Sequence, residues 1–263
     1  MKSLMNPAYE SVTAERFIKE VIPRSDFIAI PDLHGAYREL IEAIPMLREF
    51  QKTPVFLGDY VDTRGDAANS SILTLEVCMR LKAEFEQAVF LQGNHELEMI
   101  RNLKSGQLRD LPSLGSNVLA ITEYLDVLGE VPERHLEFLT ELQAYHETER
   151  FLFIHGGIGD RYAGTPIESI PEDHLCWEYG VSRRYEGKMV VCGHSLVEEP
   201  LVEARCLTIE TGVWAPRGWL TLAFLSENTR KAAFPGFIRL RLNQSPEFIV
   251  VKGQGRRRAF DPI

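Results

Sequence analysis

The sequence predicts an α/β fold, and two features of the chain carry that prediction. Five short apolar runs are typical of buried strands, and each one ends at a small polar cluster. Helical patterns separate the first three runs, which gives two β–α units in succession, as in parallel sheets. The five runs occupy residues 27–30, 54–58, 88–92, 151–154 and 189–192. Because the loops that leave parallel strands meet at one edge of a sheet, we expect the polar clusters to converge there.

The helices expected around these strands follow from the spacing of apolar residues. That spacing predicts an amphipathic helix over 8–22, which Pro23 ends before the first strand. It predicts a second helix directly after the first polar cluster and a third over about 70–86. Another helix begins at the cluster GNHE (93–96), and residues 100–147 lack strong strand signals. We expect this last segment to form a helical cap beside the site.

The C-terminal part of the chain has a different pattern. From residue 201 onward, short β-like runs alternate with turn residues, which predicts antiparallel strands that complete a second sheet. Three histidines, His135, His146 and His174, belong to none of the polar clusters, and we expect them at the surface. The three tryptophans are expected in the core or in the wall of a cavity.

Size and composition are those of a soluble globular protein, and we expect one domain over residues 1–263. The formal net charge of −9 disfavours nucleic acid and anionic membranes as partners. Only the tail GQGRRR (253–258) is basic, and we expect a solvated chain end there. We expect neither a secretion signal nor a membrane helix. Four cysteines without a CxxC pair favour reduced thiols and a cytoplasmic location.

The residue types in the polar clusters point to a metal centre. Asp32 and His34 lie two residues apart in an extended segment, so their side chains point to the same side. Asp59 directly follows the second apolar run, and a carboxylate can bridge two cations through its two oxygens. The other candidate ligands are Asn94, His155 and His194. Mixed nitrogen and oxygen ligands without thiolate suit manganese, iron or zinc, and this set can form a pair of sites.

The same five clusters resemble the signature of a known family. In order they are PDLHG (31–35), GDYVDTRG (58–65), GNHE (93–96), HGG (155–157) and GH (193–194). The series resembles that of calcineurin-like metallophosphoesterases, most closely the phosphoprotein-phosphatase type, and symmetrical diadenosine tetraphosphatases share it. The resemblance implies an α/β fold with a central β-sandwich of two mixed sheets flanked by helices. The helical cap at about 100–147 would be an insertion into that fold.

The resemblance also implies a role for each candidate ligand. Asp32 and His34 would hold one cation, and Asp59 would bridge it to a second. The second cation would take the remaining ligands, which are Asn94, His155 and His194. Two divalent cations, with manganese favoured and iron or zinc as alternatives, would activate a water molecule for in-line attack on phosphorus.

Three further motif residues would act on the substrate. His95 would protonate the leaving oxygen, and Asp62 would orient the His95 imidazole and favour its protonated form. Arg64 would bind the phosphoryl oxygens through its planar guanidinium. In the family pattern the aspartate and the arginine are adjacent, whereas Thr63 separates them here. That insertion could turn the guanidinium aside.

Two other positions depart from the family pattern. Pro31 replaces the usual glycine before the first aspartate, which removes no ligand. Many relatives carry an arginine shortly after the tryptophan that matches Trp177, and that position is not arginine here. The nearest candidates for a second phosphate-binding arginine are Arg183 and Arg184, and the sequence does not choose between them.

These expectations define one leading function and two alternatives. The leading function is a dimetal-dependent phosphoesterase that hydrolyses phosphomonoesters, and the resemblance favours phosphoserine or phosphothreonine in proteins. The first alternative is hydrolysis of a phosphoanhydride, as in symmetrical diadenosine tetraphosphatases. The second is a non-catalytic scaffold with the same fold, which the presence of all the ligands and of His95 disfavours. The expected partner is therefore a phosphorylated protein or a small phosphorylated molecule.

Overall fold

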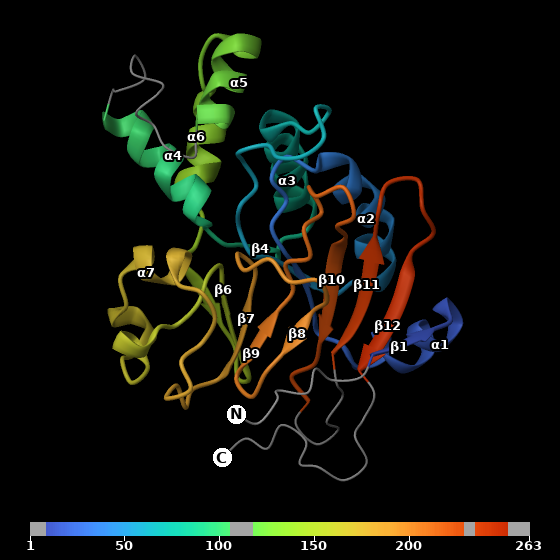
Figure 1. Cartoon of the computed structure of the whole chain (residues 1–263). Helices are drawn as coiled ribbons and strands as arrows, with labels where there is room; N and C mark the ends of the chain where they lie inside the picture. The colour runs from blue at the N-terminus through green and yellow to red at the C-terminus, as the bar shows by residue number, and fades with distance from the viewer. Residues whose placement is uncertain (1–8, 106–117, 229–234, 252–263) are drawn as a thin grey trace.

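The computed structural model describes residues 9–105, 118–228 and 235–251. The strands of this part of the chain form two mixed sheets, as predicted (Figure 1). The seven-stranded sheet has the order β1 (Tyr9–Val12), β12 (Glu247–Val251), β11 (Gly236–Leu240), β10 (Leu220–Leu225), β2 (Phe27–Ile30), β3 (Thr53–Phe56) and β4 (Val89–Phe90). The five-stranded sheet has the order β5 (Tyr145–Glu147), β6 (Phe151–Ile154), β7 (Met189–Cys192), β9 (Cys206–Thr208) and β8 (Leu201–Val202).

Each sheet combines parallel and antiparallel pairs. In the larger sheet β2, β3 and β4 are parallel to one another, and β10 joins β2 as an antiparallel neighbour. In the smaller sheet β6, β7 and β9 are parallel, and β5 and β8 are antiparallel edge strands. The parallel strands are the apolar runs that precede the polar clusters, together with β9.

Alternating side chains explain how the two sheets pack. In β6, Phe151 and Phe153 belong to an apolar cluster between the sheets. Leu152 and Ile154 belong instead to a cluster on the outer side, which includes residues of α7 (Glu172–Trp177). Because successive side chains of a strand point to opposite faces, one short apolar run supplies both clusters. Strands β2 and β3 alternate in the same way between the inner core and the helices outside it.

The helices lie outside the sandwich. They are α1 (Ala14–Glu20), α2 (Tyr37–Phe50), α3 (Ser71–Glu84), α4 (Asn94–Ser105), α5 (Val118–Leu128), α6 (Glu133–Thr140) and α7. Figure 1 shows α4, α5 and α6 grouped at one end of the molecule, far from α1. In α2 the buried residues recur at helical spacing, which fixes its apolar face toward the sheet; they are Leu40, Ala43, Leu47 and Phe50. Among the described helices, none combines the length and the apolar character needed to cross a membrane.

Two predictions of local structure were wrong. The helix expected over 8–22 is shorter, because residues 9–12 pair with β12 as strand β1 and α1 begins only after its N-cap Thr13. Strands β10, β11 and β12 do not complete the second sheet, because β10 pairs with β2 and all three extend the first sheet. Sequence pattern identifies an antiparallel strand, but the choice of sheet depends on which edge strand is free to pair.

The cap agrees with its prediction only in part. Within 100–147, the described residues include the end of α4, all of α5 and all of α6, but residues 145–147 form strand β5. Residues 106–117 and the basic tail at 253–258 lie outside the described residues. All four cysteines are buried, and none of them is in a disulfide.

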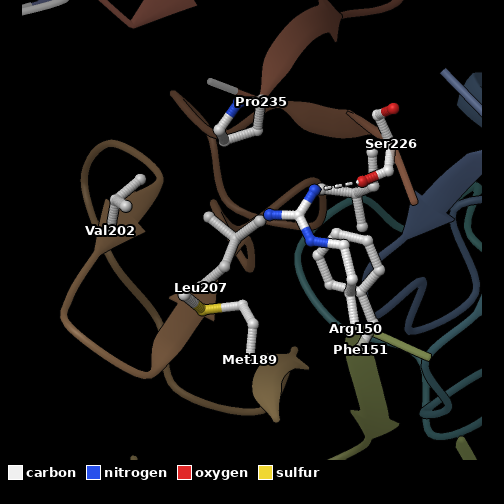
Figure 2. A pocket seen from close by; sticks show the side chains of 8 residues that line it. Arg150, Phe151, Met189, Val202, Leu207, Ser226 and Pro235 are labelled. Carbon is white, nitrogen blue, oxygen red and sulfur yellow. Dashed lines mark hydrogen bonds between the residues drawn. The ribbon is translucent and has the colours of Figure 1, made fainter. Parts of the chain in front are cut away.

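The end of the sandwich where β6 and β7 begin contains a small apolar crevice of about 30 Å³. Figure 2 shows Phe151 and Met189 at this end. The Arg150 guanidinium donates a hydrogen bond to the backbone carbonyl oxygen of Ser226 across it. The polar clusters follow the opposite ends of the same strands, so this crevice is not part of the site described next.

Candidate metal centre

Each predicted polar cluster lies just beyond the C-terminal end of a strand. The clusters after β2, β3 and β4 leave the larger sheet at one end because these strands are parallel, and the same holds for β6 and β7 in the smaller sheet. The six candidate ligands consequently meet between the two sheets. Five of them are buried, namely Asp32, His34, Asp59, Asn94 and His155. His194 is partly exposed.

Asp59 is the centre of this group. Its Oδ2 lies 3.5 Å from Nε2 of His34, 3.3 Å from Nε2 of His155 and 3.9 Å from Nε2 of His95. Among the described residues, two sets of side chains have ligand atoms close enough together to hold an ion each: His34, Asp59 and His95, and Asp59, His155 and His194. Asp59 belongs to both sets, which is the position predicted for a bridging carboxylate.

Asp32 and Asn94 lie beside these two sets. The two carboxylate oxygens of Asp32 accept hydrogen bonds from the backbone N–H of His194 at 3.0 and 3.1 Å. Oδ1 of Asn94 lies 2.9 Å from Nε2 of His155. The first set contains His95, whereas the sequence predicts that Asp32 is the ligand beside His34. Both residues are therefore within the cluster, and only the assignment of their roles differs.

The donor atoms fit divalent cations. Nε2 of His194 is buried and has no hydrogen-bond partner in the described part of the chain. An orphaned buried nitrogen is costly unless it has a ligand, and a cation supplies one. The set offers imidazole nitrogens and carboxylate and amide oxygens without thiolate, which suits manganese, iron or zinc.

The ring nitrogens of two ligands are kept neutral by their surroundings. Burial lowers the pKa of His34 to about 3 and that of His194 to about 4. Burial raises the pKa of Asp32 to about 6. Burial would also raise the pKa of Asp59, but the neighbouring histidines, His155 first, hold that pKa well below its ordinary value. Burial would lower the pKa of His155, but Asp59 and Asp32 outweigh it and raise that pKa to about 10, so a cation bound at His155 would displace a proton.

The loops that carry these side chains are held in a left-handed backbone conformation. The φ angle is +43° at His34, +51° at Asp59, +66° at Asp62 and +56° at His194. Each such residue costs on the order of 1–3 kcal/mol and persists only where its surroundings hold it. Here the backbone N–H of His34 donates to the carbonyl oxygen of Asp59 at 2.8 Å, which ties two of these loops together.

Two glycines of the motifs make room for the carboxylates. A Cβ on Gly93 would lie 2.1 Å from Oδ1 of Asp59, and a Cβ on Gly193 would lie 2.1 Å from Oδ1 of Asp32. Both distances are far below van der Waals contact. The glycines that precede Asn94 and His194 in the sequence are therefore required by the approach of a carboxylate from another strand.

Glu96 holds the loop of the bridging carboxylate and was not assigned a role from the sequence. Its carboxylate accepts hydrogen bonds from the backbone N–H groups of Asp59, Tyr60, Val61 and Gly93 at 2.8–3.1 Å. The side chain is fully buried, and burial raises its pKa to about 7. The only sequence signal for it is its place at the end of GNHE.

His95 and Asp62 form the pair that the resemblance implies. Nδ1 of His95 lies 2.9 Å from Oδ2 of Asp62. Burial would lower the pKa of His95, but Asp59 and Asp62 outweigh it and raise that pKa above its ordinary value. Nη2 of Arg64 lies 2.9 Å from Nε2 of His95, and its guanidinium lies 5.3 Å from the ring centre of Trp214. The inserted Thr63 therefore leaves Arg64 at the site.

The site opens into a pocket of about 180 Å³. Its lining includes Trp177, Tyr179, Leu196 and Trp214, of which the first three are among the exposed large hydrophobic residues. The Tyr179 ring centre lies 4.5 Å from that of His194. The expectation that the tryptophans are core or cavity-wall residues holds for two of the three, whereas the roles of Tyr179 and Leu196 were not foreseen.

Other expected surface and phosphate-binding residues have different positions. Neither Arg183 nor Arg184 is among the residues that line the pocket. The Arg184 guanidinium donates instead to the carbonyl oxygen of Asp160. His135, expected at the surface, is fully buried between α3, α5 and α6. Its position in the polar stretch around α6 concealed a buried face that it shares with Phe138 and Leu139.

Comparisons with known proteins agree with this geometry. The family model for calcineurin-like phosphoesterases matches residues 26–205. A crystal structure of a candidate diadenosine tetraphosphatase is 17% identical, with a TM-score of 0.56 over 84% of this chain and 96% of that one. A protein serine/threonine phosphatase from Saccharomyces cerevisiae is 15% identical, with a TM-score of 0.53 over 88% of this chain and 87% of that one.

A cold-active protein tyrosine phosphatase is also similar, at 15% identity and a TM-score of 0.54 over 90% of this chain and 83% of that one. At these identities the solved structures show a shared fold. The family match is the stronger finding, because it spans well over half of the chain and contains every polar cluster described above. This protein belongs to the calcineurin-like phosphoesterase family and is a metal-dependent phosphoester hydrolase.

Proposed function

We propose that the chain hydrolyses phosphomonoesters at a pair of divalent cations bound at Asp59. One cation would be held by Asp32 and His34, and Asp59 would bridge it to the second. The second cation would be held by Asn94, His155 and His194. The observation that carries this proposal is that Oδ2 of Asp59 lies within 4 Å of histidines from different loops, while the His95–Asp62 pair lies directly beside it.

The protein's own groups supply the remaining steps. The cations, when bound, supply Lewis-acid charge and activate a water molecule for attack on phosphorus. His95 donates a proton from Nε2 to the leaving oxygen, while Asp62 holds Nδ1 and stabilises the protonated ring. Arg64, whose Nη2 lies beside that Nε2, binds the phosphoryl oxygens. Although His95 has a nitrogen near Asp59, the contact with Asp62 supports an acid role in preference to a ligand role.

The substrate proposed first is phosphoserine or phosphothreonine in a protein. The pocket is open and its rim is lined by Trp177, Tyr179 and Leu196, which suits a phosphate carried on a larger molecule with apolar surface. The alternative is a diadenosine tetraphosphate, because one similar structure is a candidate diadenosine tetraphosphatase and an aromatic rim can stack on adenine. The metal proposed first for this site is manganese, with iron or zinc as alternatives.

We further propose that residues 1–263 act as one domain with an inserted cap. The four buried, free cysteines support a reducing compartment such as the cytoplasm. The acidic net charge of −9 supports a phosphorylated protein or small molecule as partner in preference to nucleic acid.

A substrate panel tests this function. Purified protein is stripped with a chelator, reloaded with manganese, iron or zinc, and assayed for phosphate release from a phosphoserine peptide, a phosphotyrosine peptide and diadenosine tetraphosphate. The proposal expects turnover that the chelator abolishes and that is highest on the phosphoserine peptide. Faster cleavage of diadenosine tetraphosphate would establish the alternative. Bound metal without turnover of any substrate would favour the non-catalytic scaffold.

A further inference from the structure

We propose that Glu123, in the cap helix α5, is a positioning residue for the proton donor of the reaction. Through the N-terminus of α3 it holds Asp62, and through Asp62 it holds the imidazole of His95. The inference rests on the proposed function, because it assigns Glu123 to the proton transfer from His95. The contacts that connect the cap to His95 join the Glu123 carboxylate to the α3 backbone, Ser71 to the Asp62 backbone, and Asp62 to the His95 ring.

The first contact is between the two helices. The Glu123 carboxylate accepts hydrogen bonds from the backbone N–H groups of Ser71 at 2.9 Å and of Ile72 at 3.4 Å, and from the hydroxyl of Ser70. Ser70 is the N-cap of α3, and its Oγ accepts from the N–H of Leu73 at 3.1 Å. A carboxylate at a helix N-terminus satisfies otherwise orphaned donors and interacts favourably with the helix dipole. Glu123 therefore fixes the first turn of α3.

The second contact joins the first turn of α3 to the loop that carries Asp62. The hydroxyl oxygen of Ser71 accepts a hydrogen bond from the backbone N–H of Asp62 at 3.1 Å, and Ser71 is fully buried. Asp62 has a φ of +66°, so its conformation depends on such contacts. Its Oδ2 lies 2.9 Å from Nδ1 of His95. A displacement of the α3 turn would move the Asp62 backbone and with it the carboxylate that orients His95.

A third set of contacts holds α5 in place at Tyr124, the residue that follows Glu123. The hydroxyl of Tyr124 lies 2.7 Å from Nδ1 of His135 in α6. Nε2 of His135 lies 3.0 Å from Oε1 of Glu76 in α3. Tyr124 and His135 are fully buried. Since α5 is also connected to α3 through Tyr124 and the α6 residue His135, a substitution of Glu123 should leave the helices docked and change mainly the contact with the α3 turn.

The expected signature depends on the leaving group. A misplaced proton donor slows the release of a basic phenolate, whereas dinitrophenolate leaves without protonation. For Glu123→Ala we expect kcat to fall about tenfold with phenyl phosphate and less than about twofold with 2,4-dinitrophenyl phosphate. Metal content per chain, measured by elemental analysis, should stay at the wild-type value.

Matched variants distinguish a positioning role of Glu123 from a general loss of structure. Asp126→Asn removes an exposed carboxylate from the same helix and should leave both rates unchanged. Glu123→Gln keeps the shape and one acceptor oxygen, so it should recover part of the phenyl phosphate rate even if Glu123→Ala folds poorly. Ser71→Ala should reproduce the dependence on the leaving group, and the double variant Glu123→Ala with Ser71→Ala should lose less than the product of the two single losses.

The outcome for His95→Ala distinguishes the two levels of the proposal. In one outcome, His95→Ala loses far more rate with phenyl phosphate than with dinitrophenyl phosphate, but the Glu123 variants lose both rates equally or lose neither. That outcome overturns only the positioning role of Glu123. If His95→Ala shows no such difference, the proposed acid role of His95 falls and the role of Glu123 falls with it. A selective loss in the Glu123 and Ser71 variants, parallel to that of His95→Ala, supports the inference.

Discussion

The edge of the two sheets and the helical cap differ in how their functional contacts arise. At the sheet edge, every candidate ligand lies within a few residues of the end of a strand, so the pairing of the strands brings the side chains together. In the cap, single polar side chains such as Glu123 and His135 make the described contacts with α3. The pairing of the strands thus determines where the candidate site lies, and in the described residues the cap contacts α3 through a few side chains.

The two regions also differ in the strain of their backbone conformations. The ligand loops contain several residues in the left-handed conformation, and they are held by buried backbone hydrogen bonds to Glu96 and Asp59. Such strained conformations persist at a site where the packed sheets hold the backbone in place. The contacts of the cap with α3 are made by single side chains, and those of Glu123 and Glu76 are only partly buried. Changes at the sheet edge should therefore have the larger effects on activity, and changes in the cap the smaller ones.

The largest effect is expected for Asp59→Asn. The amide keeps the shape but removes the charge that would serve both cations, so metal and activity should be lost together. Elemental analysis and phosphate release on the same sample measure the two quantities. Full metal occupancy with normal turnover would contradict a dinuclear centre.

The second effect is expected for His95→Ala. Removing the proton donor should lower kcat by roughly 10²–10⁴ with a basic leaving group. Metal content should stay near the wild-type value, because the proposed ligands remain in place. A variant that keeps most of its turnover would show that another group protonates the leaving oxygen, and one that loses metal would show that His95 is a ligand.

The rim of the pocket should have a smaller effect that depends on the substrate. Tyr179 is 70% exposed and its ring lies against that of His194, so Tyr179→Ala removes apolar surface without removing a ligand. We expect KM to rise about three- to tenfold for a substrate that contacts the rim, by the loss of roughly 1 kcal/mol of binding. The KM for free phenyl phosphate should change less. Equal changes for all substrates would exclude a role of the rim in selecting them.

The smallest effect on activity is expected for the buried histidine of the cap. His135→Ala leaves the Tyr124 hydroxyl and the Glu76 carboxylate without this partner, which should lower the free energy of unfolding by about 1–3 kcal/mol. Urea denaturation measures that loss. A variant as stable as the wild type would show that the buried cluster does not fasten the cap to α3.

The pH dependence of this cluster follows from Glu76. The hydrogen bond from Arg134 and, to a lesser degree, that from His135 hold the pKa of Glu76 below its ordinary value. A carboxylate with a depressed pKa contributes stability above the pKa of the unfolded chain, and that contribution is lost as pH falls through the folded-state pKa. Glu76→Gln should therefore lower stability at neutral pH, by no more than about 1 kcal/mol because the group is partly exposed, and should have less effect in acid.

The same comparison explains which parts of the protein the sequence could predict. The ligands at the sheet edge were predictable because each follows a strand of recognisable pattern, and loops after parallel strands share one end of a sheet. Glu210 lines the pocket beside Asp32 but was not predicted, because its place there depends on how segments far apart in the sequence come together. The sheet to which β10 belongs was mispredicted for a related reason, since its pairing with β2 is a contact between distant segments.

The cap was less predictable for the same physical reason. His135 was expected at the surface because charged residues surround it, yet Phe138 and Leu139 share its face at helical spacing, and that spacing could have revealed its burial. The contact between Glu123 and the α3 turn joins residues about 50 positions apart in the sequence, and no local pattern encodes it. Arg183 and Arg184 were candidates only because they are the arginines that follow Trp177 most closely, and neither lines the pocket.

Anomalous diffraction from crystals grown with Mn²⁺ would show whether Asp59 bridges a pair of cations. Two manganese peaks roughly 3.5–4 Å apart are expected. Both peaks should contact a carboxylate oxygen of Asp59, with His34 beside one and His155 and His194 beside the other. A single peak, a pair that does not share Asp59, or a cluster of the six side chains that stays without manganese would contradict a dinuclear centre bridged by Asp59.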